Sequence, residues 1–509
     1  MNYLIGVDEG TTGCKAVLFD DSGSEIFSAN REYPSYYPNP GWVEQDINEI
    51  SKAVVDSCRE IIIKGIDAGI NINDIRGISH SNQGITMVLL DENEKPVFPH
   101  TIGWQDLRHV SLLSTLEKEI NLDEYWNITG MKFGTYNIPV IRWLQKFESE
   151  KWKNVRRICS HQDYFLRMYG ADGYYIDEGS ANFMSMVDRN TNEWDEKIVK
   201  LFNIDIEMLP KIIHKPGFVV GNVSKEFSDK TGIPTTCKVT LGGLDTNCCS
   251  LAAGANKKGM QVLIMGTAGV SIVVSDKDTL DPNGRITVRS NPGFKNYQNY
   301  IMTNTGASAF RWFRDSICSM EVATSKLMGK DPYDLITEIA AQSKPGANGV
   351  MALTCIQGAH ARYKNENARG TILGIHLGTT KADLAEAILE GICFEMKEIL
   401  RMNENLSGEI KHVRLCGGVS KSKLWSQMFA DVFEKPVELT ETKELGALGA
   451  AMQAGIGAGI FKDCEDAINR CVRVKEKYLP NKEKSDFYSK LFSEWEKNYS
   501  IAINDIYIT

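Results

Sequence analysis

The stretch LIGVDEGTTGCKAVLFDD, residues 4–21, decides the fold of this chain. An apolar run leads into a short turn rich in Gly and Thr, and a second apolar run ends in an Asp-containing turn, which is the pattern of a β-hairpin. Glycines at a hairpin tip let the backbone approach a ligand closely, and free N–H groups with threonine hydroxyls can bind an anion. The tip therefore predicts a phosphate-binding loop.

A second stretch, VLIMGTAGVSIVVSD at residues 262–276, repeats this pattern. Aligned without a gap, Gly10 falls on Gly266 and Thr11 falls on Thr267, 256 residues further along a chain of 509 residues. A repeat at half the chain length indicates two domains that each begin with the same hairpin. Hairpins need glycine at their turns in any case, but two such tips facing each other would also clamp a polyphosphate.

The bulk composition fits two globular domains and a small-molecule partner. The chain is longer than one hydrophobic core usually serves, and its 42% apolar and 24% charged residues are ordinary for globular proteins. A net charge of −9 and a pI near 5.6 argue against nucleic acid, which requires a clustered basic surface. The twelve cysteines include no CxxC pair, so neither a zinc ribbon nor a disulfide framework is indicated.

The sequence also lacks the patterns of an export signal and of a membrane span. The beginning, MNYLIGVDEG, has no basic stretch followed by an apolar one, and no segment offers about 18 uninterrupted apolar residues. We therefore expect a cytoplasmic protein with no membrane partner.

Charged residues flank the first hairpin tip. Asp8 ends an apolar strand two residues before Gly10, where a carboxylate can hold hydrated Mg²⁺ beside phosphates, and Lys15 lies beyond the tip. An Asp at a strand end is often only a turn former, but the neighbouring Gly-Thr-Thr tip favours the metal role. Neither GxxxxGK[ST] nor a GxGxxG after a strand occurs, so a nucleotide must be held in another way.

The rest of the chain alternates between strand-like and helix-like stretches, which predicts an α/β protein. KVTLGGLDTNCCSLAAG, residues 238–254, places Asp245 after a strand and a Gly pair, before a helix of small residues. KHVRLCGGVSKSKLWSQMFADVF, residues 411–433, repeats this design with Gly417 and Gly418 before an amphipathic helix. A Gly pair there allows close approach of a ligand or tight packing of strand on helix, and both remain open. The run GALGAAMQAGIGAGIF, residues 446–461, is expected to pack closely against a neighbouring element.

Several motifs occur in an order that resembles the FGGY carbohydrate kinases, over nearly the whole chain. They are GVDEGTTGCKAVLFD, GWVEQD, WQDLR at Trp104 to Arg108, GGLDTN, MGTAG, RGTILGIHLGTTKADLAEAILEGICFEM from Arg369, and LCGGVSKS. The resemblance implies two ribonuclease H-like domains of the actin-like ATPase type with a catalytic cleft between them. Residues 1–247 would form the sugar-binding domain and residues 248–509 the ATP-binding domain. It also implies ATP and Mg²⁺ as cofactors, a small sugar or polyol as substrate and, at the level of the family, a homodimer.

The resemblance implies a role for each candidate residue as well. Asp245, at the position of the family's Gly-Gly-x-Asp motif, would be the base that accepts the proton of the substrate hydroxyl, and Asp8 would act on Mg²⁺ through water. The residues on the ATP phosphates would be Thr11, Thr12, Lys15, Gly266, Thr267 and Gly306. The adenine side would be formed by Gly417, Gly418 and Ser422, and Ser422 stands where relatives often carry Asn.

The segment SNQGITMVLLD, residues 81–91, bears on the substrate. Glycerol kinases show Asn-Gln-Arg-Glu-Thr there and xylulokinases show Gln-Met-His-Gly, whereas here Gln83 is followed by Gly84 and Ile85. A ketopentose, a polyol or a sugar acid therefore remains open. Amides and carboxylates pair with hydroxyls and an indole covers C–H surface, so the candidates for the sugar pocket are Asn82, Gln83, Trp104 and Asp106, together with the base Asp245.

Each of these candidates has an alternative interpretation. Trp104 could equally belong to the core, and Asp106 could pair internally with Arg108. For the whole chain, the alternative is a nucleotide-dependent switch protein of the actin-like superfamily without sugar kinase activity. Asp245 after a Gly pair and the stretch from Arg369 favour the kinase. An acetate-type kinase would call for a carboxylate-binding Arg, which the sequence does not place.

Overall fold

The computed structural model describes residues 1–134, 137–359 and 361–507. Two compact units share the chain. The first unit comprises Met1–Asn256, Arg289–Tyr297 and Glu444–Val472, and the second comprises Lys257–Val288, Gln298–Lys443 and Arg473–Thr509. The chain thus leaves the first unit after Asn256, and two later segments return to it.

A six-stranded sheet forms the centre of the first unit, in the order β13-β14-β5-β1-β2-β3. The strands are β1 (Tyr3–Glu9), β2 (Gly13–Asp20), β3 (Glu25–Glu32), β5 (Ile75–Asn82), β13 (Val219–Asn222) and β14 (Lys238–Leu244). β1 and β2 form the antiparallel hairpin predicted from the opening stretch. β14, β5 and β1 run parallel, and Glu9 and Leu244 both pair with Asn82, so the carboxyl ends of three strands meet at one edge.

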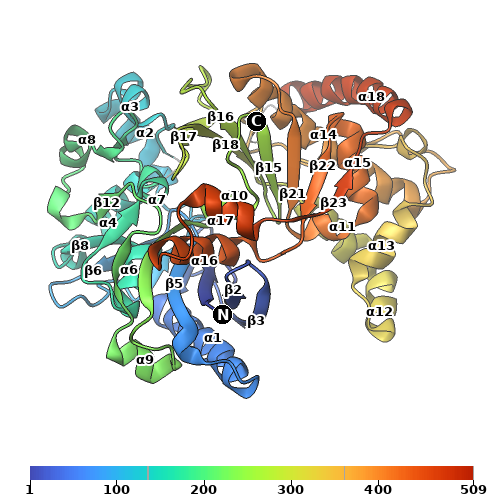
Figure 1. Ribbon diagram of the computed structural model, residues 1–509. Helices are drawn as coiled ribbons and strands as arrows, with labels where there is room; N and C mark the ends of the chain where they lie inside the picture. The colour runs from blue at the N-terminus through green and yellow to red at the C-terminus, as the bar shows by residue number, and fades with distance from the viewer. Residues whose placement is uncertain (135–136, 360, 508–509) are drawn as a thin grey trace. The chain divides into compact units, whose positions relative to one another are not determined.

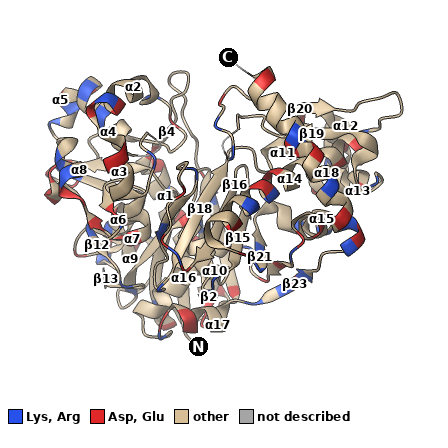
Figure 2. Ribbon diagram, turned by 90° about the horizontal axis from the view of Figure 1, so that it is seen from above, with Lys and Arg blue, Asp and Glu red and all other residues tan. Residues whose placement is uncertain are grey.

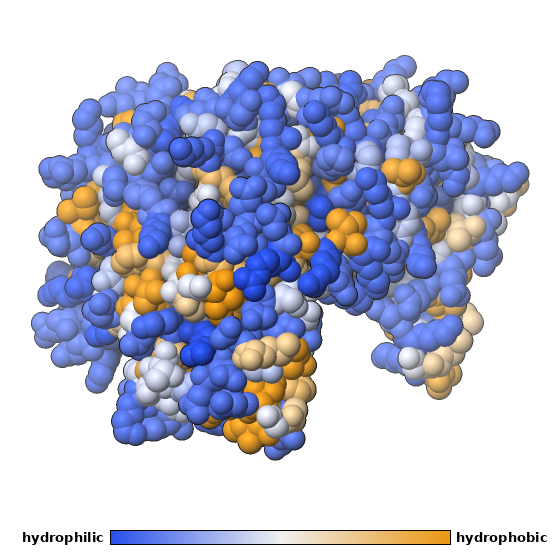
Figure 3. All heavy atoms as spheres, in the orientation of Figure 1, coloured by the Kyte–Doolittle hydropathy of each residue, from blue (hydrophilic) through white to orange (hydrophobic). Residues whose placement is uncertain are grey.

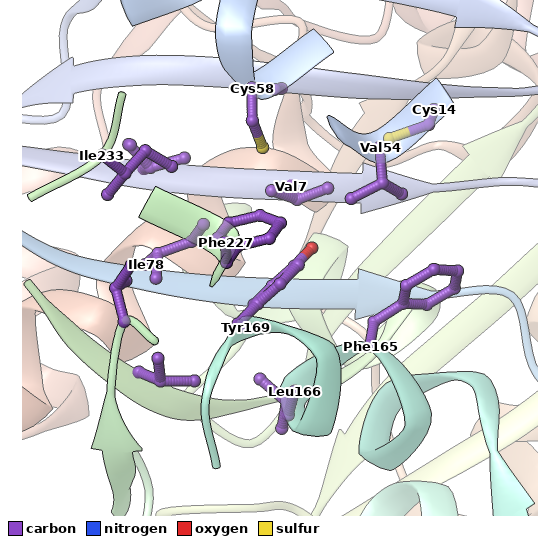
Figure 4. Packing of buried hydrophobic residues seen from close by; sticks show 14 of the residues in the cluster. Val7, Cys14, Val54, Cys58, Ile78, Phe165, Leu166, Tyr169, Phe227 and Ile233 are labelled. Carbon is purple, nitrogen blue, oxygen red and sulfur yellow. The ribbon is translucent and has the colours of Figure 1, made fainter. Parts of the chain in front are cut away.

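Apolar side chains beneath this sheet form the main core of the unit. Figure 4 shows Val7 and Ile78 of the sheet with Val54 and Cys58 of α1 (Ile47–Asp67) and Tyr169 of α6 (His161–Tyr169). The apolar positions of α1 recur at helical spacing, and Asp46 caps the helix by accepting from the backbone of residue 48. The helix predicted for this stretch is therefore confirmed.

A helix of small residues, α16 (Leu445–Gly457), packs on the sheet although it comes some 360 residues after β5 in the chain. Figure 1 shows it in red-orange beside β5 in blue. A Cβ on Gly6 would lie 1.8 Å from the carbonyl oxygen of Ala447, and a Cβ on Gly449 would lie 2.1 Å from that of Cys248 in α10 (Asp245–Ala252). Glycine permits these backbone approaches, so the expected close packing of this run is confirmed.

The other elements of the first unit are β4 (Glu44–Asp46), β6 (Met87–Leu90), β7 (His100–Ile102), α2 (Val110–Glu119), α3 (Leu122–Thr129), α4 (Asn137–Phe147), α5 (Ser149–Trp152), β8 (Arg157–Ser160), β9 (Tyr175–Asp177), α7 (Glu178–Asn182), β10 (Val187–Asp188), β11 (Glu193–Trp194), α8 (Glu196–Leu201), β12 (Lys211–Ile213), α9 (Lys225–Thr231) and α17 (Cys464–Cys471). Most of them surround a second apolar core, whereas α9 packs on α1 and α17 packs on α16. β4 pairs with β7 and β6 pairs with β8, each as a separate two-stranded sheet.

A seven-stranded sheet organises the second unit, in the order β17-β18-β16-β15-β21-β22-β23. Its strands are β15 (Met260–Met265), β16 (Gly269–Ser275), β17 (Thr287–Ser290), β18 (Tyr297–Thr303), β21 (His412–Cys416), β22 (Val437–Thr440) and β23 (Val474–Tyr478). β15 and β16 form the second hairpin, and β21 runs parallel to β15. The repeated hairpin predicted from the sequence is thus present in both units.

Helices and a small second sheet complete the second unit. They are α11 (Ser308–Ile317), α12 (Ser319–Met328), α13 (Pro332–Ala340), β19 (Met351–Leu353), β20 (Thr371–Leu373), α14 (Lys381–Ser407), α15 (Lys423–Phe433) and α18 (Lys482–Ile501). Most of α14 is buried, and Thr380 and Asp383 form a capping box at its start.

The surface is polar and carries both charges. Figure 2 shows acidic and basic residues interspersed along the helices, and hydrophilic side chains dominate the face seen in Figure 3. Within the described ranges, no helix combines the length and the apolar character that a bilayer span requires.

Candidate active site

Two carboxylates lie at the edge where β14, β5 and β1 end. Asp8 is the penultimate residue of β1, and the hydroxyl of Ser81 in β5 donates to its Oδ1 at 2.7 Å. Asp245 is the first residue of α10, and its Oδ1 accepts from the backbone N–H of Thr246 at 2.6 Å. Two acidic groups far apart in the sequence, one in β1 and one directly after β14, therefore share one edge of the sheet.

Both carboxyl groups have a raised pKa. Burial, together with the charge of Asp8, raises the pKa of Asp245 to about 7, although the hydrogen bond from Thr246 and the charge of Arg289 oppose the rise. Burial likewise raises the pKa of Asp8 to about 6, against the hydrogen bond from Ser81. The two groups can therefore exchange protons near neutral pH, and a cation bound beside them would favour their charged forms.

The donor set suits Mg²⁺ held through water. Among the described residues, no group of three or more His, Cys, Asp or Glu side chains has the geometry to hold a metal ion. Mg²⁺ commonly keeps several waters and binds through one or two carboxylates together with substrate phosphates. Asp8, with Asp245 nearby, fits that mode of binding.

The first hairpin tip is closed and flanked by an ion pair. The N–H of Gly10 donates to the carbonyl of Gly13 at 3.0 Å, and Thr12 is exposed at the tip. The ammonium of Lys15 lies 2.8 Å from Glu444, the residue that precedes α16, and both side chains are partly exposed. An exposed threonine and a partly exposed ammonium group thus stand at the tip.

The amides predicted for the sugar pocket are buried and precisely oriented. The Nε2 of Gln83 donates to Glu9 at 2.7 Å and to Gln45 at 2.8 Å, and the Nδ2 of Asn82 donates to the carbonyl of Gln83 at 2.9 Å. Among the residues that the structure describes, none donates a hydrogen bond to the side-chain oxygen of Asn82 or of Gln83. Such buried acceptors are uncommon in folded proteins and indicate a place where a donor from water or a ligand is expected.

Trp104 and Asp106 occupy different surroundings. The indole Nε1 of Trp104 donates to the hydroxyl of Thr11 at 3.0 Å, which links this candidate directly to the hairpin tip. Asp106 is 2% exposed, and its oxygens accept from Arg108 at 2.9 Å and from the backbone N–H of Val43 at 2.7 Å. The internal pairing with Arg108, which was the alternative interpretation of Asp106, is therefore present.

The Gly84–Ile85 step has an unusual backbone. Ile85 has a φ of 67°, a left-handed conformation that β-branched residues rarely adopt. A Cβ on Gly84 would lie 2.6 Å from Leu244, the residue before Asp245. Strained backbone of this kind tends to occur at functional sites, and here it separates Gln83 from β6.

In the second unit, the nucleotide candidates gather around the tip of the second hairpin. Gly266 and Thr267 are exposed at that tip, and their carbonyls accept from the backbone N–H groups of Ala307 at 2.8 Å and Ser308 at 3.2 Å. Gly306 lies against the tip backbone, since a Cβ there would come within 2.4 Å of residue 268.

The Gly pair after β21 adjoins the same tip. Gly417 has a φ of 88°, and a Cβ on it would lie 2.4 Å from the carbonyl oxygen of Met265, the residue before the tip. A Cβ on Gly418 would meet nothing within 4 Å, so this glycine borders open space. Ser422 caps α15 by accepting from Trp425 at 3.3 Å. The helix therefore begins at Lys423, after a short 3₁₀ turn, rather than directly at Gly418.

Four further residues belong to the site and were not among the candidates. Glu9 and Gln45 sit inside quoted motifs, next to Asp8 and within GWVEQD, but nothing in their spacing showed that both accept from Gln83. Gly446 faces Asp8 and belongs to the run for which only close packing was expected. Arg289 lies over the ring of Phe183 at 4.5 Å, and its Nη2 is 3.5 Å from the hydroxyl of Thr246. No motif in the sequence points to Arg289.

The chain is similar to a known protein family and to several of its members. Residues 3–252 match the model of the FGGY family of carbohydrate kinases, N-terminal domain, and residues 261–458 match that of the C-terminal domain. The chain is 27% identical to the gluconokinase of Bacillus subtilis (strain 168), over 96% of this chain and 94% of that protein. It is 26% identical to a xylulose kinase of Staphylococcus epidermidis, over 97% and 96%.

Solved structures show the same fold. The gluconate kinase from Lactobacillus acidophilus superposes with a TM-score of 0.88 at 24% identity, covering 98% of each chain. The Plasmodium falciparum glycerol kinase with ADP superposes with a TM-score of 0.85 at 23% identity, covering 99% of this chain and 98% of that one. The two-domain α/β fold expected from the sequence is therefore confirmed.

Proposed function

Because the chain belongs to the FGGY family of carbohydrate kinases, we propose that it transfers the γ-phosphoryl group of ATP to a hydroxyl of a small sugar, with Asp245 as the base. The enzyme is a phosphotransferase with a sugar or polyol as acceptor. The observation that carries the proposal is the pair Asp8 and Asp245 at one edge of the sheet, beside a glycine-rich hairpin tip.

Asp245 suits the role of a base that accepts a late proton. Phosphoryl transfer passes through a loose transition state, so the protein supplies mainly alignment and charge neutralisation. With its pKa raised to about 7, Asp245 binds a proton far more readily than an ordinary aspartate, yet a large fraction is charged at neutral pH. It can therefore take the proton of the attacking hydroxyl as the new P–O bond forms and the bond to ADP breaks.

Asp8, the two hairpin tips and Lys15 would serve the phosphates. Mg²⁺ supplies charge neutralisation on the ATP oxygens when it is bound. Asp8 would hold the ion through water, while Thr11, Thr12 and Lys15 would contact the transferred phosphoryl group. In the second unit, the remaining phosphates would lie on Gly266, Thr267 and Gly306, and the adenine on Gly417, Gly418 and Ser422. The contacts of both tips with their neighbouring loops support these roles.

The sugar would be bound by Asn82, Gln83 and Trp104, with Asp106 holding Arg108 and the loop of Val43 in place. Relatives of similar identity are named gluconokinase, xylulose kinase and glycerol kinase, so overall similarity does not select the acceptor. Arg289 lies close to Thr246 and to the charge of Asp245. A guanidinium suits a carboxylate, and we therefore place sugar acids first among ketopentoses, polyols and sugar acids.

The alternative is a nucleotide switch of the actin-like superfamily without kinase activity. The two functions differ in the fate of the γ-phosphoryl group, which a kinase delivers to an alcohol and a switch delivers to water. Phosphorus NMR of the products after incubation with ATP, Mg²⁺ and each candidate sugar distinguishes them. A phosphate ester supports the kinase and identifies the hydroxyl, whereas inorganic phosphate alone with every sugar contradicts it.

Two further features complete the proposal. An enzyme that consumes ATP works where ATP is made available, so we propose the cytoplasm as its compartment. A homodimer is proposed at the level of the family, and light scattering of the purified protein tests it by giving the molar mass directly.

A further inference from the structure

Glu9, the neighbour of Asp8, is a fully buried carboxylate with three donors around it. Its Oε1 accepts from Gln83 at 2.7 Å and from the hydroxyl of Tyr33 at 3.1 Å, and its Oε2 is 3.2 Å from the Nδ1 of His161. Its side chain and that of His161 are 0% exposed. Burying a carboxylate costs several kcal/mol unless it is paired and hydrogen-bonded. The burial of Glu9 therefore costs free energy, and its hydrogen-bond partners offset that cost.

A chain of hydrogen bonds connects Glu9 to the tip of the first hairpin. Gln83 donates through the same Nε2 to Gln45 at 2.8 Å, and Gln45 donates through its own Nε2 to the carbonyl of Thr11 at 2.7 Å. Each amide thus has one possible orientation, because its NH₂ group must face an acceptor at the next step. The chain of contacts runs in one direction from Glu9 through Gln83 and Gln45 to Thr11.

Two other contacts reach the tip. The hydroxyl of Tyr33 also bonds to the carbonyl of Gly10, and the indole of Trp104 donates to the hydroxyl of Thr11. The carbonyls of Gly10 and Thr11 are both occupied by side chains of this network, which comprises Glu9, Tyr33, Gln45, Gln83 and Trp104. These hydrogen bonds fix the orientation of the two peptide groups. The orientation of the tip therefore depends on the same network that includes the side chains proposed to contact the sugar.

We propose that Glu9 and Gln45 are positioning residues that couple the sugar pocket to the phosphate-binding tip. This inference rests on the proposed function, in which Gln83 and Trp104 contact the sugar and the tip contacts the transferred phosphoryl group. A sugar that immobilises Gln83 and Trp104 fixes the tip in the conformation that binds phosphate. By linkage, the sugar then tightens ATP binding and ATP tightens sugar binding by the same factor.

Two substitutions break the network at different points, and a third preserves it. Gln45→Leu cuts the link between Gln83 and Thr11 without touching Glu9, while Glu9→Leu removes the centre. Glu9→Gln keeps one oxygen to accept from Gln83 and offers an NH₂ group to His161, whose neutral ring can accept at Nδ1. Tyr169→Phe is the matched control, because it removes one buried hydrogen bond of 2.8 Å, to His80, in the same core but outside the network.

The experiment measures the affinity of a non-hydrolysable ATP analogue with Mg²⁺ by calorimetry, with and without the sugar that the wild type phosphorylates. Coupling energies between sites typically correspond to factors of about 5 to 150. We expect the wild type, Glu9→Gln and Tyr169→Phe to show a ratio of at least about 5, and Gln45→Leu and Glu9→Leu to fall below about 2. Should Glu9→Leu fail to fold, Gln45→Leu carries the test.

The outcomes separate this inference from the proposed function. If the wild type phosphorylates no sugar acid, ketopentose or polyol, both the proposed function and the coupling are overturned. A wild type that phosphorylates a sugar but binds the analogue equally with and without it overturns the coupling alone. The coupling is also overturned if Gln45→Leu retains the wild-type affinity ratio. It is overturned as well if Tyr169→Phe loses the ratio to the same extent as Gln45→Leu, since the loss would then come from a general loosening of the core.

Discussion

The carboxylate of Asp8 lies against the backbone of Gly446, so that a Cβ at residue 446 would come within 2.4 Å of both carboxylate oxygens. Gly446 is the second residue of α16, whose first turn therefore faces the proposed metal-binding group. Free N–H groups in the first turn of a helix favour a neighbouring negative charge. We therefore propose that the small-residue helix contributes to the site as well as to packing.

Gly446→Ala should displace Asp8 and lower kcat by about 100-fold, since a shift of about 1 Å in a catalytic group costs that much. The variant should also require more Mg²⁺ for half-maximal rate. Steady-state rates at several Mg²⁺ concentrations measure both effects. Gly65→Ala in α1 is the matched control, because its Cβ would meet Leu18 at an ordinary 3.8 Å and its activity should not change. Equal activity of the two variants would contradict the role of Asp8.

The raised pKa of Asp245 predicts an acidic limb in the rate profile. With the pKa near 7 rather than 3.8, the free enzyme loses its base as the pH falls. The value of kcat/KM should decrease about tenfold per pH unit well below pH 7. A flat profile from pH 5 to pH 8 would argue against Asp245 as the base.

The same shift has a defined sign in stability. A carboxyl whose pKa is higher in the folded protein than in the unfolded chain favours folding while it is protonated, and this contribution is lost as the pH rises from about 4 to about 7. Asp245→Asn removes the cost of a buried charge, so it should raise the melting temperature more at pH 8 than at pH 5. Melting curves of both proteins at the two pH values test this, and a gain confined to pH 5 would reverse the sign.

The ion pair between Lys15 and Glu444 predicts a direct effect on ATP. Lys15 lowers the pKa of Asp8 while Glu444 raises it, so the two charges of the ion pair act in opposite directions on the proposed metal-binding group. Lys15→Met should raise the KM for MgATP by about 10- to 100-fold, from the roughly 1.5–3 kcal/mol of a hydrogen bond with a charged group. Lys15→Arg should recover part of this loss. An unchanged KM in Lys15→Met would show that Lys15 does not contact the phosphates.

We expect that replacing Ser422 by Asn increases the affinity for adenine. Asn caps helices as well as Ser does, so Ser422→Asn should leave α15 intact and add an amide where relatives often carry one. The KM for ATP should fall by about 2- to 10-fold, and the preference for ATP over GTP should rise. Ser422→Ala, as control, loses the cap and about 1 kcal/mol of stability but should not change the preference. A preference unaltered in Ser422→Asn would place the adenine elsewhere.

The sequence predicted those parts of the site that local patterns determine. The hairpins could be found because apolar runs and Gly/Thr turns have a period that shows in a short stretch, and Asp245 follows a strand and a Gly pair that mark a strand-to-helix turn. Gly446 could not be placed opposite Asp8, since α16 joins the first unit only through long-range packing. Arg289 comes from another returning segment. Buried amide networks such as that of Glu9 and Gln45 depend on side-chain orientation, which spacing does not reveal.

The most direct test of the central claim is ADP release from ATP and Mg²⁺ across a panel of sugar acids, ketopentoses and polyols, with wild type beside Asp245→Asn. We predict strong stimulation by one compound and a loss of about 100- to 10,000-fold in kcat in the variant, the range of general-base catalysis. The variant should still bind ATP. Stimulation by no compound, or a variant as active as the wild type, would contradict the account of this protein as a sugar kinase with Asp245 as its base.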